Sequence, residues 1–197
     1  MNEQDTKAQI LAAATAVFTE KGFAKASMND IVRAAGLSKG GVYWHFKSKD
    51  AIVAAIFDQF FTGQLLVLDT VKNSDGSAGD KILQLAALTG GDLVDMAVQF
   101  PSPLEFYAMA AREEYLTQAL QSYLIAYQEY MSAFIQQGID EGDFREVDVA
   151  DTAVTLGALF EGIFLLWAVY PTEIDMDRQL KTAVHLLLDG LRKAELK

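Results

Sequence analysis

The 197-residue chain contains no cysteine and only two histidines and three prolines. Without cysteine it forms no disulfide, offers no thiol nucleophile and supplies no thiolate ligand to zinc. Neither His45 nor His185 has a glutamate three residues before it, so the Glu-x-x-His pairs of a di-iron bundle are absent. The chain also lacks an H-E-x-x-H motif and a phosphate-binding glycine loop. We therefore expect no catalytic residues, no metal and no cofactor.

Long hydrophobic runs are also missing. The longest apolar run, residues 156–169, includes Glu161 and falls short of the roughly 20 residues that cross a bilayer. A buried helix explains this run better than a membrane span. The polar residues 1–6 do not resemble a signal peptide. We expect a cytoplasmic protein, and the lack of cysteine is consistent with a reducing compartment.

Positive charge is scarce except near the start of the chain. The formal net charge is −11, but residues 1–50 carry a net +2 and residues 51–197 a net −13. Apolar residues make up 51% of the chain, too many for disorder. The charge distribution allows a nucleic acid to bind at the N-terminal end while the acidic remainder repels it. An acidic part that is simply a solvated surface explains the same pattern.

Residues 27–36 have the pattern of a short helix with two defined ends. Ser27 is a good N-cap, and Asp30 completes a capping box with Asp in place of Glu or Gln. Apolar residues at 31, 32 and 35 supply one buried face. Gly36 ends the helix, because glycine tolerates the left-handed backbone that a helix C-terminus needs.

A second short helix is predicted from Lys39 to His45, with Ser38 as its N-cap and with Val42 and Phe46 facing inward. Two short helices joined by a glycine turn form a helix-turn-helix unit. The second helix of such a unit lies in the major groove of DNA.

These residues carry a family resemblance. The stretches I-L-A-A-A-T-A-V-F-T-E-K-G-F at 10–23 and G-L-S-K-G-G-V-Y-W-H-F-K-S-K-D at 36–50 closely resemble the N-terminal domain of the TetR family of bacterial transcriptional regulators. The resemblance covers roughly residues 6–56. It implies a dimeric DNA-binding regulator in which a helical body follows the DNA-binding domain. Beyond residue 56 the chain is similar to the family only in length, helical pattern and a short G-x-F-R connector at 142–145.

The residue types of the second short helix predict separate roles on DNA. Lys39 can donate to guanine or to a phosphate, and Trp44 can contact a thymine methyl group. Tyr43 and His45 carry donors suited to phosphate oxygens, although a surface histidine would also explain His45. The resemblance implies operator contacts for most of the same positions. The complete predicted DNA-binding set is Ser27, Met28, Ser38, Lys39, Gly40, Gly41, Tyr43, Trp44, His45 and Lys49.

The rest of the chain is predicted to be helical throughout. The fold class is all-α, with about nine or ten helices: a three-helix DNA-binding domain at 1–50 and a larger ligand-binding and dimerisation body at 51–197. We expect a break at Gly90 and Gly91, and final helices at 149–169 and 176–193. Both final helices have apolar stripes too wide for one buried face. The resemblance implies that they form a four-helix bundle with a second copy.

The body is rich in aromatic and methionine side chains. Tyr123, Tyr127, Tyr130 and Phe134 follow one helix face, and Glu161 interrupts an apolar helix. Each alone is explained as ordinary core, with Glu161 in solvent or paired across a dimer; as a set they indicate a cavity wall. The predicted ligand-binding set is Met96, Phe100, Phe106, Met109, Arg112, Tyr123, Tyr127, Met131, Phe160, Glu161, Phe164 and Trp167.

Three functions are compatible in principle with a helical chain of this composition. The first is a dimeric, sequence-specific transcriptional regulator, a repressor that an apolar or aromatic small molecule releases from a palindromic operator. The second, an all-helical enzyme, lacks every motif that it would need. The third is a DNA-binding protein of the same fold that acts architecturally or through a protein partner. Only the aromatic set separates the first from the third.

Overall fold

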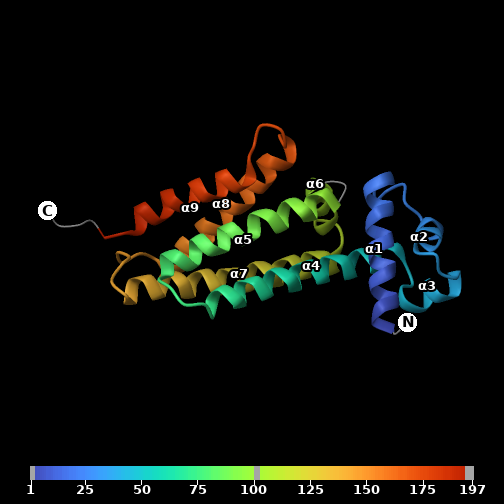
Figure 1. Cartoon of the computed structure of the whole chain (residues 1–197), viewed down its shortest axis with the longest axis horizontal. Coiled ribbons are helices and arrows are strands. Elements are labelled where there is room, and N and C mark those ends of the chain that lie inside the picture. Colours follow the sequence, from blue (N-terminus) through green and yellow to red (C-terminus); the bar gives the residue numbers. More distant parts are fainter. Residues whose placement is uncertain (1–2, 100–102, 194–197) are drawn as a thin grey trace. The chain divides into compact units, whose positions relative to one another are not determined.

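The computed structural model describes residues 3–99 and 103–193, with the side chains of 90–99, 103, 105 and 106 left out. Within these ranges the chain is all-α, which confirms the predicted fold class (Figure 1). The one β feature in the described ranges is an isolated bridge between Phe144 and Arg192. The helices are α1 (Glu3–Lys21), α2 (Met28–Ala35), α3 (Lys39–His45), α4 (Lys49–Lys72), α5 (Ala78–Gln99), α6 (Pro103–Ala110), α7 (Glu114–Asp140), α8 (Val149–Val169) and α9 (Met176–Leu191).

The chain folds as two compact units. The first comprises Met1–Phe61 and Asp95–Ala119, and the second comprises Thr62–Val94 and Leu120–Lys197. The helix α4 is continuous from one unit into the other, since its residues 49–61 belong to the first and 62–72 to the second. The functional boundary expected at residue 50 stays a prediction, because compactness does not test it.

In the first unit, α1, α2 and α3 form a small domain around one apolar core. α1 contributes Ile10 and Phe18, which are at most 1% exposed, and α2 contributes Ile31. The Gln9 amide donates to the carbonyl of Ala35 at 2.8 Å and so ties α1 to the end of α2. Each of the two short helices is too short to be stable alone, so this packing is what holds them.

The break predicted at Gly90 and Gly91 is wrong. α5 runs without interruption from Ala78 through both glycines to Gln99. Two glycines cost a helix about 1 kcal/mol each relative to alanine. The described first half of α5 is well packed, with Ile82 and Leu85 at 1% exposure, and tertiary packing commonly outweighs a weak helix propensity.

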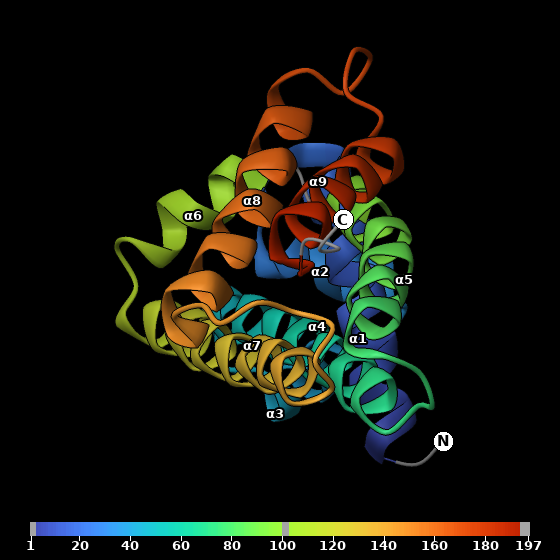
Figure 2. The same ribbon diagram turned by 90° about the vertical axis from the view of Figure 1, so that its left-hand side faces the viewer.

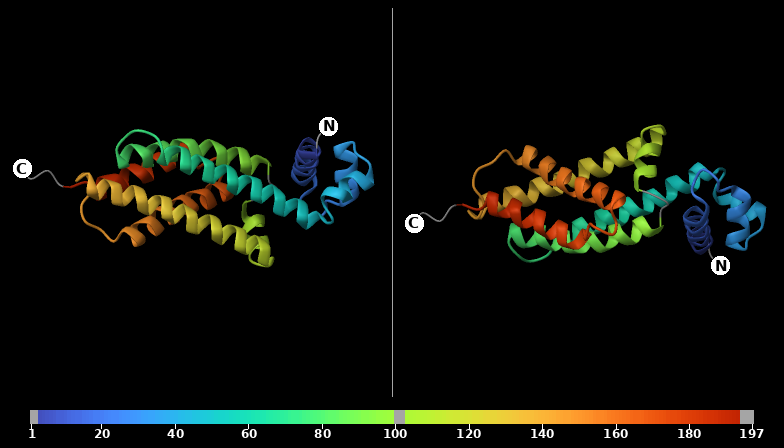
Figure 3. Two further views of the ribbon diagram at one scale, coloured as in Figure 1. Left: turned by 90° about the horizontal axis from the view of Figure 1, so that it is seen from below. Right: turned by 90° about the horizontal axis from the view of Figure 1, so that it is seen from above.

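In the second unit, the later parts of α4 and α7 lie side by side and run in the same direction (Figure 3). The Tyr130 hydroxyl donates to Oδ1 of Asp69 at 3.3 Å, and the Gln137 amide donates to the carbonyl of Gly76 at 3.4 Å. The first bond joins α7 directly to α4, and the second joins α7 to the turn that follows α4.

The helices α8 and α9 also pack on each other within the second unit (Figures 1 and 2). Asp148 caps α8 and Asp175 caps α9, each by accepting a hydrogen bond from a backbone N–H of the first turn. Before α8, the connector at 142–145 pairs with the end of α9, where the Arg145 N–H donates to the carbonyl of Leu191 at 2.8 Å.

By length and composition alone, α4 and α8 are apolar enough to cross a membrane. The apolar run at 156–169 is short, but the helix that contains it spans 21 residues. Core helices of proteins without membrane segments pass the same test. Length and composition therefore do not distinguish α4 and α8 from core helices.

Candidate nucleic-acid interface

The helix α3 presents its large side chains in the arrangement predicted from the sequence. The Ser38 hydroxyl accepts a hydrogen bond from the N–H of Gly41 at 3.0 Å and fixes the start of the helix. Val42 and Phe46 are buried at 0% and 5% exposure, which confirms the inward face. Trp44 is 74% exposed, so the core of the domain does not use its indole.

The remaining outward residues of α3 gather around Tyr43. Lys39 is exposed, and its ammonium group lies 5.6 Å from the centre of the Tyr43 ring. The ammonium group of Lys47 donates to the carbonyl of Tyr43 at 2.8 Å and satisfies the end of the helix. Tyr43 and His45 are both half-buried. α3 therefore exposes Lys39 and Trp44 and leaves Tyr43 and His45 partly exposed.

The two glycines of α3 are not required by packing inside the protein. A Cβ atom built on Gly40 meets nothing within 4 Å, and one on Gly41 meets only the Ser38 hydroxyl at 3.2 Å. Neither glycine has a positive φ. Both glycines lower the stability of the helix relative to alanine, and packing inside the protein does not require them. A close approach of DNA phosphates to the helix start would explain why they are present.

The start of α2 carries the predicted capping box in full. The Ser27 hydroxyl accepts from the N–H of Asp30, and the Asp30 carboxylate accepts from the N–H of Ser27 at 3.0 Å. The ammonium group of Lys21 also donates to Asp30, at 2.7 Å. The hydrogen bond from Lys21, and then those from Ser27, hold the pKa of the Asp30 carboxyl well below its usual value of 3.8. Ser27 is exposed, and its neighbour Met28, also in the predicted DNA-binding set, is half-buried.

This depressed pKa predicts a pH dependence of stability. The Asp30 charge stabilises the folded state above the unfolded-state pKa, about 3.9, and this contribution is lost as the pH falls further. We expect Asp30→Asn to melt at a lower temperature than the parent at pH 7, with a smaller difference at pH 3. Thermal unfolding at both pH values measures this. Asp58→Asn, at an exposed position on α4, is the control; a difference for Asp30→Asn as large at pH 3 as at pH 7 would contradict the assignment.

Lys49, the first residue of α4, uses its ammonium group inside the first unit. It donates to the carbonyls of Phe23 at 2.6 Å and Ala26 at 3.1 Å, and it lies 4.2 Å from the centre of the Phe23 ring. These contacts hold the start of α4 against the turn between α1 and α2. Contact of Lys49 with DNA stays a prediction. To make it, the ammonium group would have to replace a hydrogen bond to one of these carbonyls by a hydrogen bond to a phosphate.

The predicted ligand-binding residues divide among three places. Phe100 and the side chains of Met96 and Phe106 lie outside the described parts of the chain. Half-buried Met109 and exposed Arg112 belong to the first unit. The second unit holds the others, which are Tyr123, Tyr127, Met131, Phe160, Glu161, Phe164 and Trp167.

In the second unit, the side chains of α7 and α8 meet around Tyr127. Its ring centre lies 6.3 Å from those of Tyr123 and Phe160. Gly157 makes room for the ring, since a Cβ atom there would be 3.3 Å from Cε1 of Tyr127. Burial is the main cause that raises the pKa of both tyrosine hydroxyls; the charge of Glu161 adds to it for Tyr123, and Tyr123 and then Glu161 add to it for Tyr127. Four predicted residues, Tyr123, Tyr127, Phe160 and Glu161, thus contact or act electrostatically on one another. Two more, Phe164 and Trp167, stack on each other further along α8 with ring centres 6.2 Å apart.

Gln64 is a buried polar residue of the second unit that the predicted ligand-binding set does not include. This α4 side chain is only 4% exposed, and its Oε1 atom has no hydrogen-bond partner in the described structure. Gln64 occupies the same helix face as Leu68 and Val71, at spacings of four and three. A single polar residue on an otherwise apolar stripe was the signal that could have found it.

A capped helix-turn-helix that exposes large aromatic and basic side chains defines a DNA-binding domain. The comparisons with known proteins assign it to a family. Residues 10–56 match the family model of bacterial regulatory proteins, tetR family, and residues 83–192 match that of the BetI-type transcriptional repressor, C-terminal. The chain belongs to the TetR family of transcriptional regulators.

Individual relatives agree with this assignment. The uncharacterised HTH-type transcriptional regulator YfiR of Bacillus subtilis is 33% identical over 143 residues, which is 72% of this chain and 69% of YfiR. A transcriptional regulator of Pseudomonas aeruginosa has the same fold, with a TM-score of 0.82 and 22% identity over 96% of this chain and 91% of its own. SmeT of Stenotrophomonas maltophilia, solved as a complex with triclosan, gives a TM-score of 0.77 and 24% identity over 98% of this chain and 95% of its own. The protein is therefore a regulator and not an enzyme.

Proposed function

We propose that the protein is a cytoplasmic, dimeric repressor that binds a palindromic operator and is released by an apolar or aromatic small molecule. The observation that carries the DNA-binding part is the exposed surface of α3. Trp44 is 74% exposed and Lys39 is exposed beside Tyr43, on a helix whose opposite side is fully buried. An exposed tryptophan on the outer side of this helix can contact base edges, such as a thymine methyl group, in the major groove.

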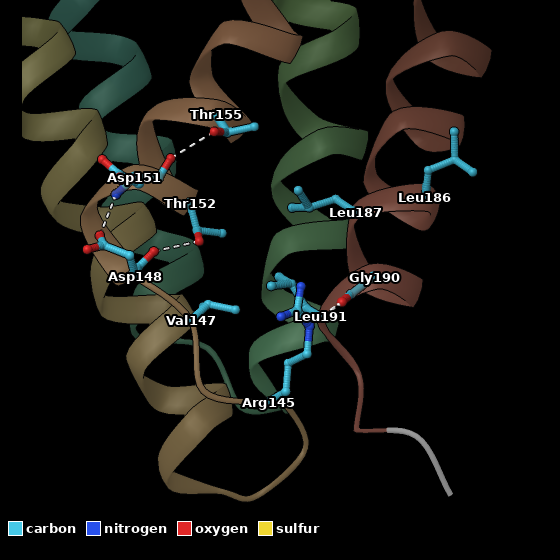
Figure 4. Close-up of a pocket in the computed structure, with 10 residues that line it drawn as sticks. All are labelled: Arg145, Val147, Asp148, Asp151, Thr152, Thr155, Leu186, Leu187, Gly190 and Leu191. Atoms are coloured by element: carbon cyan, nitrogen blue, oxygen red, sulfur yellow. Dashed lines mark hydrogen bonds between the residues drawn. The ribbon is translucent and has the colours of Figure 1, made fainter.

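Dimerisation is supported by the apolar surface that α8 and α9 expose. Leu186 on α9 is 70% exposed, and Val154, Leu166 and Val169 on α8 are each more than half exposed. Beside Leu186, the start of α8 and the end of α9 border an open groove of about 350 Å³, lined by Leu187, Leu191 and the polar first turn of α8 (Figure 4). A two-fold dimer would cover this surface with the same surface of a second copy.

The dimer is tested by Leu186→Glu. Placing a charge on this apolar surface should yield a monomer by light scattering. It should also weaken operator binding, because two half-sites about 34–36 Å apart are read only by two linked domains. Ala133→Glu, which adds the same charge at an exposed position on α7, is the control and should stay dimeric. A Leu186→Glu protein that is still a dimer would show that this surface is not the dimer interface.

The effector part rests on the tyrosine-rich cluster around Tyr127 and on α4, which is shared by both units. A ligand bound in the second unit that shifts α4 would move the start of this helix, which Lys49 holds against the DNA-binding domain. Release requires only that the ligand binds more tightly to the conformation that cannot bind DNA than to the conformation that can. The complex of SmeT with triclosan shows that a protein of this fold binds a small molecule, and this supports the proposal.

The effector is tested by screening apolar and aromatic compounds for release of fluorescent operator DNA. An effector should lower operator affinity by about 5–150-fold, the usual range of coupling between two sites. A broad screen without any active compound would instead favour a DNA-binding protein that acts architecturally or through a protein partner.

A further inference from the structure

Two buried polar atoms of the second unit have no hydrogen-bond partner among the described residues. They are Oε1 of Gln64 on α4 and the hydroxyl of Tyr127 on α7. The two side chains are only 4% and 8% exposed. Buried polar groups are nearly always hydrogen-bonded, because a buried group without a partner loses its interaction with water and gains nothing in return. A bound molecule that forms a hydrogen bond with either atom would therefore remove an energetic cost.

The two atoms come from the same level of the helix bundle. The hydrogen bond from Tyr130 of α7 to Asp69 of α4 places Tyr127, three residues earlier, near the level of residue 66 of α4. Gln64 is two residues from that level, a rise of about 3 Å along the helix axis. Both side chains are buried in the same compact unit. The two atoms thus lie at about the same height in one compact unit.

The electrostatics of this region favour a particular ligand. The charge of Glu161 contributes to the raised pKa of both Tyr123 and Tyr127, so a negative charge acts on the two hydroxyls. Among the described residues of the second unit, no lysine or arginine is buried. The Gln64 Oε1 atom can only accept a hydrogen bond, and the Tyr127 hydroxyl can accept one. The region therefore attracts hydrogen-bond donors and repels anions.

We propose that the effector carries an amine or hydroxyl group on an apolar skeleton, and that Gln64 and Tyr127 bind this group. The proposal rests on the effector site argued above and narrows its ligand. Carboxylates are rejected because they repel Glu161 and offer no donor at neutral pH. Pure hydrocarbons are rejected because they leave both polar atoms without a partner, and sites built for a hydrogen bond discriminate strongly against ligands that lack it.

Four probes with one skeleton test the proposal: 4-phenylbutylamine, 4-phenylbutanol, 4-phenylbutanoate and butylbenzene. Binding to the full-length protein without DNA is measured by calorimetry. The amine and the alcohol should bind at least about 10-fold more tightly than the other two, a difference of about 1.4 kcal/mol. Gln64→Leu and Tyr127→Phe should remove most of this preference, whereas Gln136→Leu, at an exposed position on α7, should keep it. Binding of none of the probes, or equal binding of all four, overturns the proposal.

A second measurement needs no ligand. If the two atoms lack partners in the free protein, Gln64→Leu and Tyr127→Phe should each raise Tm, by about 2–4 °C for a chain of this size. A lowered Tm would mean that these groups make stabilising hydrogen bonds in the free protein, and it would overturn the assignment. The assignment would also be overturned if carboxylates released operator DNA and bound equally well to the parent, Gln64→Leu and Tyr127→Phe proteins. That result would leave the proposed repressor function intact. A probe that binds as expected but releases no DNA would count against the repressor mechanism alone.

Discussion

Gly138→Ala should destabilise the protein by about 3 kcal/mol and lower its Tm by about 6–12 °C. A Cβ atom at this position of α7 would lie 2.2 Å from Cδ2 and 2.5 Å from Cε2 of Phe144. Phe144 is only 2% exposed, so its ring has little room to move away. The N–H groups of Asp143 and Phe144 both donate to the Gly138 carbonyl, at 3.0 and 2.9 Å, which also fixes the backbone. Thermal unfolding measures the loss.

Gly63→Ala is the matched control for this substitution. Gly63 lies inside α4, and a Cβ atom there meets nothing within 4 Å. The substitution should raise stability by about 0.5–1 kcal/mol, because alanine is the better helix former. In a double-mutant cycle, Phe144→Leu should recover part of the loss caused by Gly138→Ala. A Gly138→Ala protein as stable as the parent would show that Phe144 packs differently.

Lys39→Ala should weaken binding to the preferred operator by about 1–3 kcal/mol, which is about 5–150-fold, and should relax the preference at one base pair. Lys39 is exposed and lies beside Tyr43, so its removal should leave Tm unchanged. Binding to a panel of operators, each with one base pair changed, measures the altered preference.

Tyr43→Phe is the comparison for Lys39→Ala. Its hydroxyl is predicted to donate to a phosphate, which positions the protein without reading sequence. The substitution should weaken binding to all operators of the panel by a similar factor. If both variants lose affinity uniformly, Lys39 does not read a base and the two predicted roles are not separate.

The DNA-binding domain was predictable because its signals are local. Ser27 with Asp30, and Ser38 before two glycines, fix the helix starts through hydrogen bonds that span three residues. The bounds of α3 were predicted as observed, and Val42 is buried as expected. Lys49 is the exception, since its carbonyl partners at 23 and 26 lie more than twenty positions away. No local pattern reveals such a contact.

The body was less predictable because tertiary packing decides its details. Packing carries α5 through Gly90 and Gly91, where helix propensity alone indicates a break. The need for glycine at 138 follows from the ring of Phe144, which a sequence pattern does not place. The clustering of Tyr123 with Tyr127 was expected from their spacing of four, whereas the burial of Gln64 depends on the helices that pack against α4.

The central claim, specific operator binding by α3, is tested most directly by fluorescence anisotropy with DNA from upstream of the protein's own gene. The same protein is titrated with scrambled DNA, at 50 and 200 mM salt. The account predicts tight binding to the upstream DNA alone, with a loss of about 10³–10⁵-fold in affinity between the two salt concentrations, as expected for about six to ten phosphate contacts. Equal affinity for the two DNAs, or no binding to either, would contradict it.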